Sequence, residues 1–307
     1  IATGLGGSLT AALLAGALFA VHPVATEPVH YVSARSDSLV ALFLMTALAL
    51  WLRADTRSDA GGRYRFSSWI ASAAALWTKA TALCLPATLL LLDLARGITE
   101  PARLARRHGV VWALTVLYAA LSWWTDFLPR SLAAPSRPLL ERLLTQAKAA
   151  VYYLQLLIAP VQQSTEPQFS SAAAMTAAVS LAVLMSASLL AGAAVLRHRG
   201  GWQGLFLVGA AALSLLPTAL APLNVLVNER RAYLPLAMFA IAVAVLASRL
   251  PAGRRPASDR FALGAPVQTV MALAVVAFSL LAHARGAVWA SDLTLWQDAA
   301  RKSPAMA

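Results

Sequence analysis

Five ionisable side chains lie in the stretch HPVATEPVHYVSARSD, residues 22–37, between two long apolar runs: His22, Glu27, His30, Arg35 and Asp37. Ionisable groups at a membrane boundary are costly to desolvate, so such a cluster indicates a functional site. A carboxylate can accept a proton from a hydroxyl, and arginine can bind a phosphate through two parallel hydrogen bonds. We therefore predict Glu27 and Asp37 as catalytic carboxylates, and His22 and Arg35 as binding residues for an anionic lipid-linked or sugar substrate.

Structural roles are the alternative for these residues. His22 precedes a proline and could simply end the first helix. Arg35 could form an ion pair with Glu27 or Asp37. Asp37, or Ser36 beside it, stands where an N-cap of the following helix is expected.

Two later motifs carry further candidates for phosphate binding. Lys79 is the one ionisable residue in the apolar segment LWTKATALCLP, where burial disfavours its charged form unless an anion is near. The motif NERRAYLP supplies Glu229, Arg230, Arg231 and Tyr233 just before an apolar run. Lysine snorkelling at a helix turn is the structural alternative for Lys79. The structural alternative for Arg230 and Arg231 is an ion pair with Glu229 or with Glu27.

The composition indicates a helical membrane protein. Of the 307 residues, 59% are hydrophobic and 12% are charged, which is far from the average of soluble domains. The apolar runs do not alternate with polar residues, which excludes a β-barrel. The net charge of +12 comes largely from arginines in short loops, so we expect no nucleic-acid partner. One cysteine, Cys84, excludes an internal disulfide and argues against a redox or metal site.

The apolar runs predict an all-α, polytopic fold with about eight membrane helices. Residues 67–79 and 82–95 are short, and we expect them to be tilted helices that meet near Lys79. The segment PLLERLLTQAKAAVYYLQLLIAP, residues 138–160, is predicted as an interfacial helix, with a two-pass hairpin as the alternative. Aromatic residues at the ends of the runs are interpreted as interface anchors: Trp112, Trp123, Trp124, Tyr152 and Tyr153. The predicted spans cover 3–21, 37–53, 67–79, 82–95, 109–124, 172–196, 202–220, 233–248 and 265–284.

The arginine-rich loops predict the orientation. Loops after residues 53, 95, 196 and 248 are rich in arginine, and such loops favour the cytoplasm. All three candidate motifs then face the opposite side, which is the periplasm for a bacterial inner-membrane protein. Residues 1–285 form the predicted membrane domain. Residues 286–307 turn polar and amphipathic, as at the start of an extracytoplasmic domain. The first residue is Ile1 rather than Met, so we expect further sequence before it.

Four segments in this order resemble one family: FAVHPVATEPVHYVSARSDSLVALF, WTKATALCLPATLLLLDL, NERRAYLP and WASDLTLWQDAARKSP. They are similar to motifs of the transmembrane and tetratricopeptide-repeat-containing O-mannosyltransferases and their bacterial relatives. The resemblance implies a GT-C type glycosyltransferase fold and a tetratricopeptide repeat domain after residue 307. It also implies a polyprenyl- or dolichyl-phosphate-linked sugar as donor and a protein or glycan acceptor, with no other cofactor.

Residue by residue, the resemblance covers the three candidate motifs. His22, Glu27, Arg35 and Asp37 match the first motif, Lys79 the second, and Glu229, Arg230 and Tyr233 the third. The family motif has a glutamate at the position that Ala80 occupies in this chain. Lys79 therefore lacks the acidic neighbour that the family motif would supply. The main catalytic acid of such enzymes would precede Ile1, so the chain alone is expected to be inactive.

Two other functions compete with the glycosyltransferase. The first is a non-enzymatic membrane anchor of a repeat scaffold. The second is a transporter, which is disfavoured because the charges lie at span boundaries and no internal repeat of spans is visible.

Overall fold

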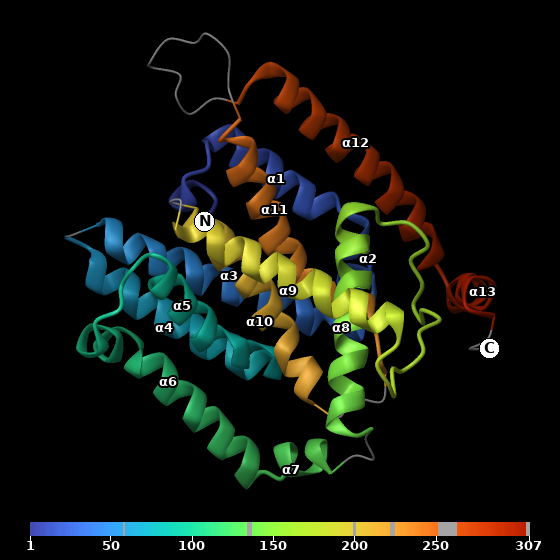
Figure 1. Ribbon diagram of the computed structural model, residues 1–307, viewed down its shortest axis with the longest axis horizontal. Helices are drawn as coiled ribbons and strands as arrows, with labels where there is room; N and C mark the ends of the chain where they lie inside the picture. Colours follow the sequence, from blue (N-terminus) through green and yellow to red (C-terminus); the bar gives the residue numbers. More distant parts are fainter. Residues whose placement is uncertain (58, 134–136, 199–200, 222–224, 251–262, 305–307) are drawn as a thin grey trace.

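The protein is helical throughout the part of the chain that the computed structural model describes (Figure 1). It describes residues 1–307 except 58, 134–136, 199–200, 222–224, 251–262 and 305–307, and those residues form no strand. The prediction of an all-α fold is confirmed. The longer helices are α1 (Leu9–Val21), α3 (Arg35–Thr56), α4 (Gly61–Thr78), α5 (Leu85–Ala95), α6 (Pro101–Trp124), α8 (Leu139–Ile158), α9 (Ala177–His198), α10 (Trp202–Leu220), α11 (Tyr233–Ala247), α12 (Ala265–Val288) and α13 (Asp292–Lys302).

Shorter helical turns connect these elements. They are η1 (Thr3–Leu5), η2 (Pro23–Ala25), α2 (Thr26–His30), η3 (Val32–Ala34), η4 (Ala80–Cys84), α7 (Phe127–Leu132) and η5 (Glu229–Ala232). Five of them, η2, α2, η3, η4 and η5, lie within the candidate motifs. The motifs therefore occupy the places where long helices are interrupted.

Five helices among the described residues are long and apolar enough to cross a membrane. The chain is thus a multi-pass membrane protein. The five are Val32–Thr56, Ala177–Arg197, Trp202–Leu220, Glu229–Ala247 and Ala265–Val288. A sixth span is possible if Leu9–Val21 and Pro23–His30, which are bent by 52°, count as one. The predicted number of about eight is not confirmed, because Ala80–Ala95 is short and α4, α6 and α8 are not among the candidates.

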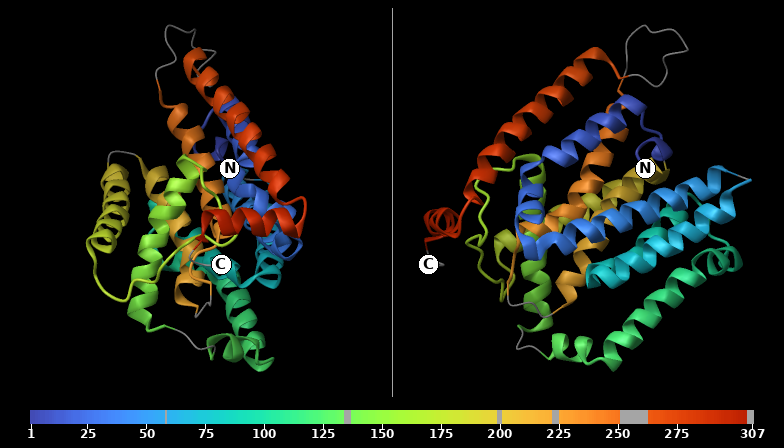
Figure 2. Two further views of the ribbon diagram at one scale, coloured as in Figure 1. Left: turned by 90° about the vertical axis from the view of Figure 1, so that its right-hand side faces the viewer. Right: turned by 180° about the vertical axis from the view of Figure 1, so that it is seen from behind.

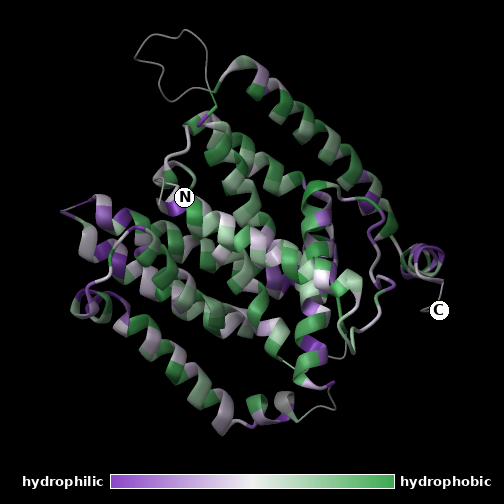
Figure 3. Ribbon diagram, in the orientation of Figure 1, coloured by the Kyte–Doolittle hydropathy of each residue, from purple (hydrophilic) through white to green (hydrophobic). Residues whose placement is uncertain are grey.

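The core lies between the α3–α4 hairpin, α5 and α10. Trp51 and Leu48 of α3, Leu85 and Leu89 of α5 and Phe206 of α10 are fully buried there. In contrast, α6 and α12 lie on opposite sides of the bundle (Figure 2), and apolar residues run along most of α12 (Figure 3). Such exposed apolar faces are what a bilayer would cover.

The chain path brings two sets of helix ends together. Helices α3 and α4 run antiparallel, so the start of α3 and the end of α4 lie at one end of the bundle, with the end of α10 and the start of α11. We call this the Asp37 end. The end of α3 lies at the other end of the bundle, with the end of α5 and the start of α6. We call this the Asp55 end.

Candidate functional site

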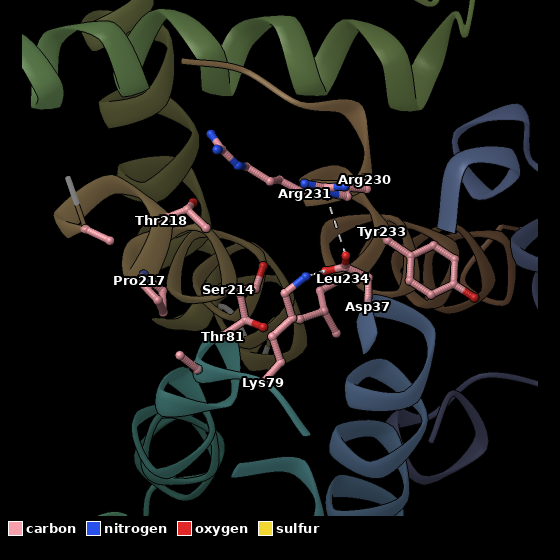
Figure 4. Close-up of a pocket in the computed structure, with 12 residues that line it drawn as sticks. Asp37, Lys79, Thr81, Ser214, Pro217, Thr218, Arg230, Arg231, Tyr233 and Leu234 are labelled. Carbon is pink, nitrogen blue, oxygen red and sulfur yellow. Dashed lines mark ion pairs between the residues drawn. The ribbon is translucent and has the colours of Figure 1, made fainter. Parts of the chain in front are cut away.

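Asp37, Lys79 and Arg230 form an ion-pair cluster at the Asp37 end (Figure 4). Lys79 Nζ lies 2.5 Å from Asp37 Oδ1. Arg230 Nε lies 3.9 Å from Asp37 Oδ2, and Arg230 Nη1 lies 3.8 Å from Glu27 Oε1. The structure thus brings together residues from all three candidate motifs.

Local breaks in the helices position these side chains. Lys79 follows the last residue of α4 in an extended conformation (φ −161°, ψ 141°), and this ends the helix before η4 begins. Arg230 lies in η5, whose N-cap residue Asn228 accepts a hydrogen bond from the Arg230 backbone N–H (3.1 Å). Asp37 lies in the first turn of α3. The N-cap of α3 is Ala34, so neither Asp37 nor Ser36 is the cap.

A pocket of about 250 Å³ lies beside the cluster. Its lining residues include three with cationic side chains, one carboxylate, the three aliphatic hydroxyl residues Thr81, Ser214 and Thr218, and Tyr233. The first turns of α3 and α11 both reach the pocket, and helix N-termini carry partial positive charge. The lining residues are Asp37, Lys79, Ala80, Thr81, Ser214, Pro217, Thr218, Ala221, Arg230, Arg231, Tyr233 and Leu234.

Two polar atoms of pocket residues are buried and have no hydrogen-bond partner in the part of the chain that the structure describes: Asp37 Oδ2 and Thr81 Oγ1. Unsatisfied buried polar atoms are rare in native proteins, because each costs free energy. By contrast, the hydroxyls of Ser214 and Thr218 donate to carbonyls of their own helix. Both atoms belong to residues that line the pocket next to Lys79 and Arg230, and Asp37 Oδ2 lies 3.9 Å from Arg230 Nε.

Glu27 lies behind Arg230 and does not line the pocket. Glu27 Oε2 accepts a hydrogen bond from the Arg230 backbone N–H (3.1 Å), and Glu27 is 4% exposed. Glu27 thus holds Arg230 in place in this structure, while Asp37 is the carboxylate that reaches the cavity.

His22 is buried away from the pocket. Its Nδ1 accepts a hydrogen bond from the Val24 N–H (3.2 Å), and its Nε2 lies 3.2 Å from the Leu157 carbonyl oxygen. These contacts fit the neutral tautomer that carries hydrogen on Nε2. The ring packs edge-on against Phe278 of α12. His22 ends α1, as its structural interpretation proposed.

Arg35 is exposed, and no ion pair or hydrogen bond is found for it within the described residues. The pairing with Glu27 or Asp37 that the sequence suggested is absent. Arg35 and Asp37 are two residues apart on α3, and side chains at this spacing do not face one another.

Arg231 and Tyr233 both line the pocket. The Arg231 guanidinium donates to the carbonyls of Val225 and Leu226 (2.9 Å each), so it also holds the chain before η5. The ring of Tyr233 packs against Phe19 of α1 at 5.0 Å between centroids. Of these two residues, Arg231 has its donors largely committed to the protein.

Glu229 points away from the pocket into a buried hydrogen-bond network. Its carboxylate accepts from Tyr152 Oη (2.8 Å), Gln163 Nε2 (3.1 Å) and the Ser164 N–H (2.8 Å). Burial, and after it the nearby Glu229 carboxylate, raise the pKa of Tyr152, so its phenol remains a hydrogen-bond donor. The sequence interpretation of Tyr152 and Tyr153 as interface anchors is wrong, because Tyr153 is only 2% exposed and Tyr152 bonds to Glu229.

A second polar network lies at the Asp55 end and was missed by the sequence analysis. Asp55 accepts from Arg65, Arg96 and Arg107. Asp93, which is 0% exposed, accepts from Trp51 Nε1 (3.2 Å) and Arg107 Nε (2.6 Å), and lies 3.0 Å from His108 Nε2. The network joins α3, α4, α5 and α6.

Metal binding receives no support from the described part of the chain. Within it, no group of three or more His, Cys, Asp or Glu side chains could hold a metal ion. Asp37 and Glu27 are bridged by Arg230 rather than arranged around a common point.

Comparison with protein-family models, with curated proteins and with solved structures finds no match to this chain. Membership in the mannosyltransferase family stays a proposal that the four sequence motifs carry. Three hydroxyl residues of the pocket were not predicted from the sequence: Thr81, Ser214 and Thr218. Single hydroxyl residues are common in apolar helices, so nothing in the sequence marked these three as pocket residues.

Proposed function

We propose that this protein is the membrane part of a GT-C type glycosyltransferase that uses a polyprenyl-phosphate-linked sugar. It would transfer a hexose, such as mannose, to a protein or glycan acceptor. The observation that carries this proposal is the pocket at the Asp37 end. There, Lys79, Arg230, the Asp37 carboxylate and the Thr81 hydroxyl line one cavity, and they come from three separate motifs.

The charges of the pocket favour an anion with hydroxyl groups. The side chains of Lys79 and Arg230 are 30% and 31% exposed, so both can still reach a ligand. Thr81 Oγ1 can donate to a phosphate oxygen, and Asp37 Oδ2 can accept from a sugar or acceptor hydroxyl. A sugar phosphate supplies both kinds of group, whereas a neutral lipid supplies no anion for the cations.

The reaction would be a substitution at the anomeric carbon. The acceptor hydroxyl oxygen forms a bond to that carbon, the bond to the lipid phosphate oxygen breaks, and the hydroxyl proton passes to a carboxylate. Lys79 and Arg230 would stabilise the charge that develops on the departing phosphate. Among the described residues, Asp37 is the carboxylate that lines the cavity.

The proposed orientation places the pocket on the periplasmic side of a bacterial inner membrane. Arginines gather at the Asp55 end, where Arg65, Arg96 and Arg107 surround Asp55 and Arg197 donates to the Leu94 carbonyl. Positively charged span ends favour the cytoplasm. The Asp37 end would then face the compartment in which lipid-linked sugars are used.

Ligand binding by the full-length protein in lipid nanodiscs tests the proposal. We expect polyprenyl phosphate to bind, and the uncharged polyprenol to bind at least tenfold more weakly. Lys79→Ala and Arg230→Ala should each weaken phosphate binding about tenfold and abolish sugar transfer, with membrane insertion intact. Arg35→Ala tests the sequence-based assignment of that residue in the same assay.

The matched control is Arg57→Ala, which removes an exposed arginine beyond the end of α3, away from the pocket. It should bind and transfer like the wild type. Equal binding of polyprenol and polyprenyl phosphate, or normal transfer by both pocket variants, would refute the proposal.

A further inference from the structure

Helix α13, the last helix that the structure describes, is connected to the pocket by a series of polar contacts, some of them buried. It follows α12 and packs beside the connection 159–176 between α8 and α9 (Figures 1 and 2). Ser303, at the C-cap of α13, is 2% exposed, and Gln163 and Ser164 of the connection are 5% and 2% exposed. Polar residues so deeply buried in a connection indicate a specific arrangement rather than a loose loop.

The first step joins α13 to the connection. Lys302 Nζ donates to the Gln163 carbonyl (2.8 Å), and Ser303 Oγ donates to the Glu166 carbonyl (2.6 Å). Lys302 is itself held by Asp298, which also accepts from Arg285 of α12 (2.6 Å). The end of α13 is therefore fixed both to α12 and to the connection.

The second step joins the connection to η5. Gln163 Nε2 and the Ser164 N–H both donate to the Glu229 carboxylate (3.1 and 2.8 Å). The preceding residue, Gln162, has a φ of +57°, which is unfavourable for a residue other than glycine. The connection is thus held in a strained conformation that presents two donors to Glu229.

The third step joins Glu229 to the pocket. Glu229 and Arg230 are neighbours in η5, and the Arg230 backbone N–H is fixed by Glu27 Oε2 and Asn228 Oδ1 (3.1 Å each). The Arg230 side chain then reaches Asp37 in the pocket. Arg230 both forms an ion pair with Glu27 and lines the pocket.

We propose that α13 is a positioning element for the pocket, through contacts that run from Lys302 and Ser303 by way of Gln163 and Ser164 to Glu229 and Arg230. The segment that follows the last membrane span thereby controls how firmly Arg230 is held for an anion. A ligand that binds to α13 would then change how firmly Arg230 is held at the pocket. The binding part of this inference rests on the proposed function, whereas the mechanical part does not.

Hydrogen–deuterium exchange of the full-length protein in nanodiscs tests the mechanical part without a ligand. In Lys302→Ala/Ser303→Ala, we expect amide exchange to become about fivefold faster in residues 163–166 and also in residues 229–232. Lys302→Arg keeps a donor at this position and should restore wild-type exchange when Ser303 is present. Arg301→Ala is the control, because this exposed residue of the same helix has no hydrogen bond or ion pair within the described residues.

The outcomes separate the two proposals. Faster exchange in residues 163–166 with unchanged exchange in residues 229–232 would overturn the inference, whatever the protein binds. The single variant Ser303→Ala serves the same comparison if the double variant does not fold. In a parallel measurement, polyprenyl phosphate should bind the double variant about three- to tenfold more weakly than the wild type. Absence of binding to the wild type would refute the proposed function and leave the exchange result standing.

Discussion

Lys79 Nζ lies 2.5 Å from Asp37 Oδ1, and this ion pair joins the end of α4 to the first turn of α3. The same pair sets the charge of the pocket. Without a ligand, Asp37 is the counter-ion of Lys79, and its Oδ2 lies 3.9 Å from Arg230 Nε. An incoming phosphate would compete with Asp37 for both cations, and it would leave the Asp37 carboxylate free to accept a hydrogen bond from a hydroxyl.

This competition predicts opposite effects of Asp37→Asn on binding and on catalysis. Removing the negative charge should tighten polyprenyl phosphate binding about threefold, because Lys79 and Arg230 lose a competing anion. The gain is modest, since both cations are about one-third exposed and therefore partly screened by water. Sugar transfer should fall at least a hundredfold if Asp37 accepts the proton. Equilibrium binding and transfer rates on one preparation measure both effects.

Asp59→Asn is the control for this variant, because Asp59 is an exposed acid in the turn between α3 and α4. It should change neither quantity. Weaker phosphate binding by Asp37→Asn would show that Asp37 organises the cations rather than competing for them.

The orientation of the bundle is open to a direct labelling test in cells. Cys84 is buried, so the unmodified protein should not react with a membrane-impermeant maleimide. Ser33→Cys places a thiol at an exposed position of the Asp37 end, and Arg57→Cys places one beyond the Asp55 end. We expect Ser33→Cys to react from the outer side and Arg57→Cys to react only after the membrane is permeabilised. Reaction of both from the same side would contradict the topology.

Glu229 is predicted to contribute to stability more than to ligand contact. Glu229→Ala leaves the donors of Tyr152, Gln163 and Ser164 without their acceptor in a buried place, which costs about 2–3 kcal/mol. Thermal unfolding in detergent should show a lower midpoint, and Tyr152→Phe should show a smaller decrease. Glu166→Ala removes an exposed carboxylate from the same connection and should unfold like the wild type. A wild-type midpoint for Glu229→Ala would contradict the network.

Much of the helical pattern could be predicted from the apolar runs alone. The run 202–220 coincides with α10, and 233–248 differs by one residue from α11. The turn at Lys79 was also predicted, because one uninterrupted helix would have put two arginine loops on opposite faces. The predicted count of about eight spans is not confirmed, since apolar length alone does not distinguish a helix that crosses the membrane from one that packs inside the bundle.

The side-chain partners could not be predicted in the same way. Three motifs were expected to converge, and the structure brings Asp37, Lys79 and Arg230 together, but Lys79 replaces Arg35 as the partner of Asp37. Which side chains meet depends on the rotation of each helix about its axis and on the backbone conformation of single residues such as Lys79. The spacing of apolar residues in the sequence predicts neither of them.

Asp93 illustrates the same limit at the other end of the bundle and leads to a strong stability prediction. It is the acid of the apolar segment LLLLDL, and the nearby arginines were interpreted only as determinants of orientation. In the structure, Asp93 is fully buried and binds Trp51 and Arg107, with His108 at 3.0 Å. Asp93→Ala removes the common partner of these groups, and breaking a buried ion pair in this way costs about 3–5 kcal/mol.

The order of three aspartate variants checks this interpretation. Asp93→Ala should lower the thermal unfolding midpoint most. Asp55→Ala should lower it less, because the Asp55 side chain is 16% exposed and water can replace part of its contacts. Asp59→Ala should leave it unchanged, since this exposed acid has no ion pair within the described residues. Equal midpoints for Asp93→Ala and Asp59→Ala would mean that the network at the Asp55 end does not hold α3, α4, α5 and α6 together.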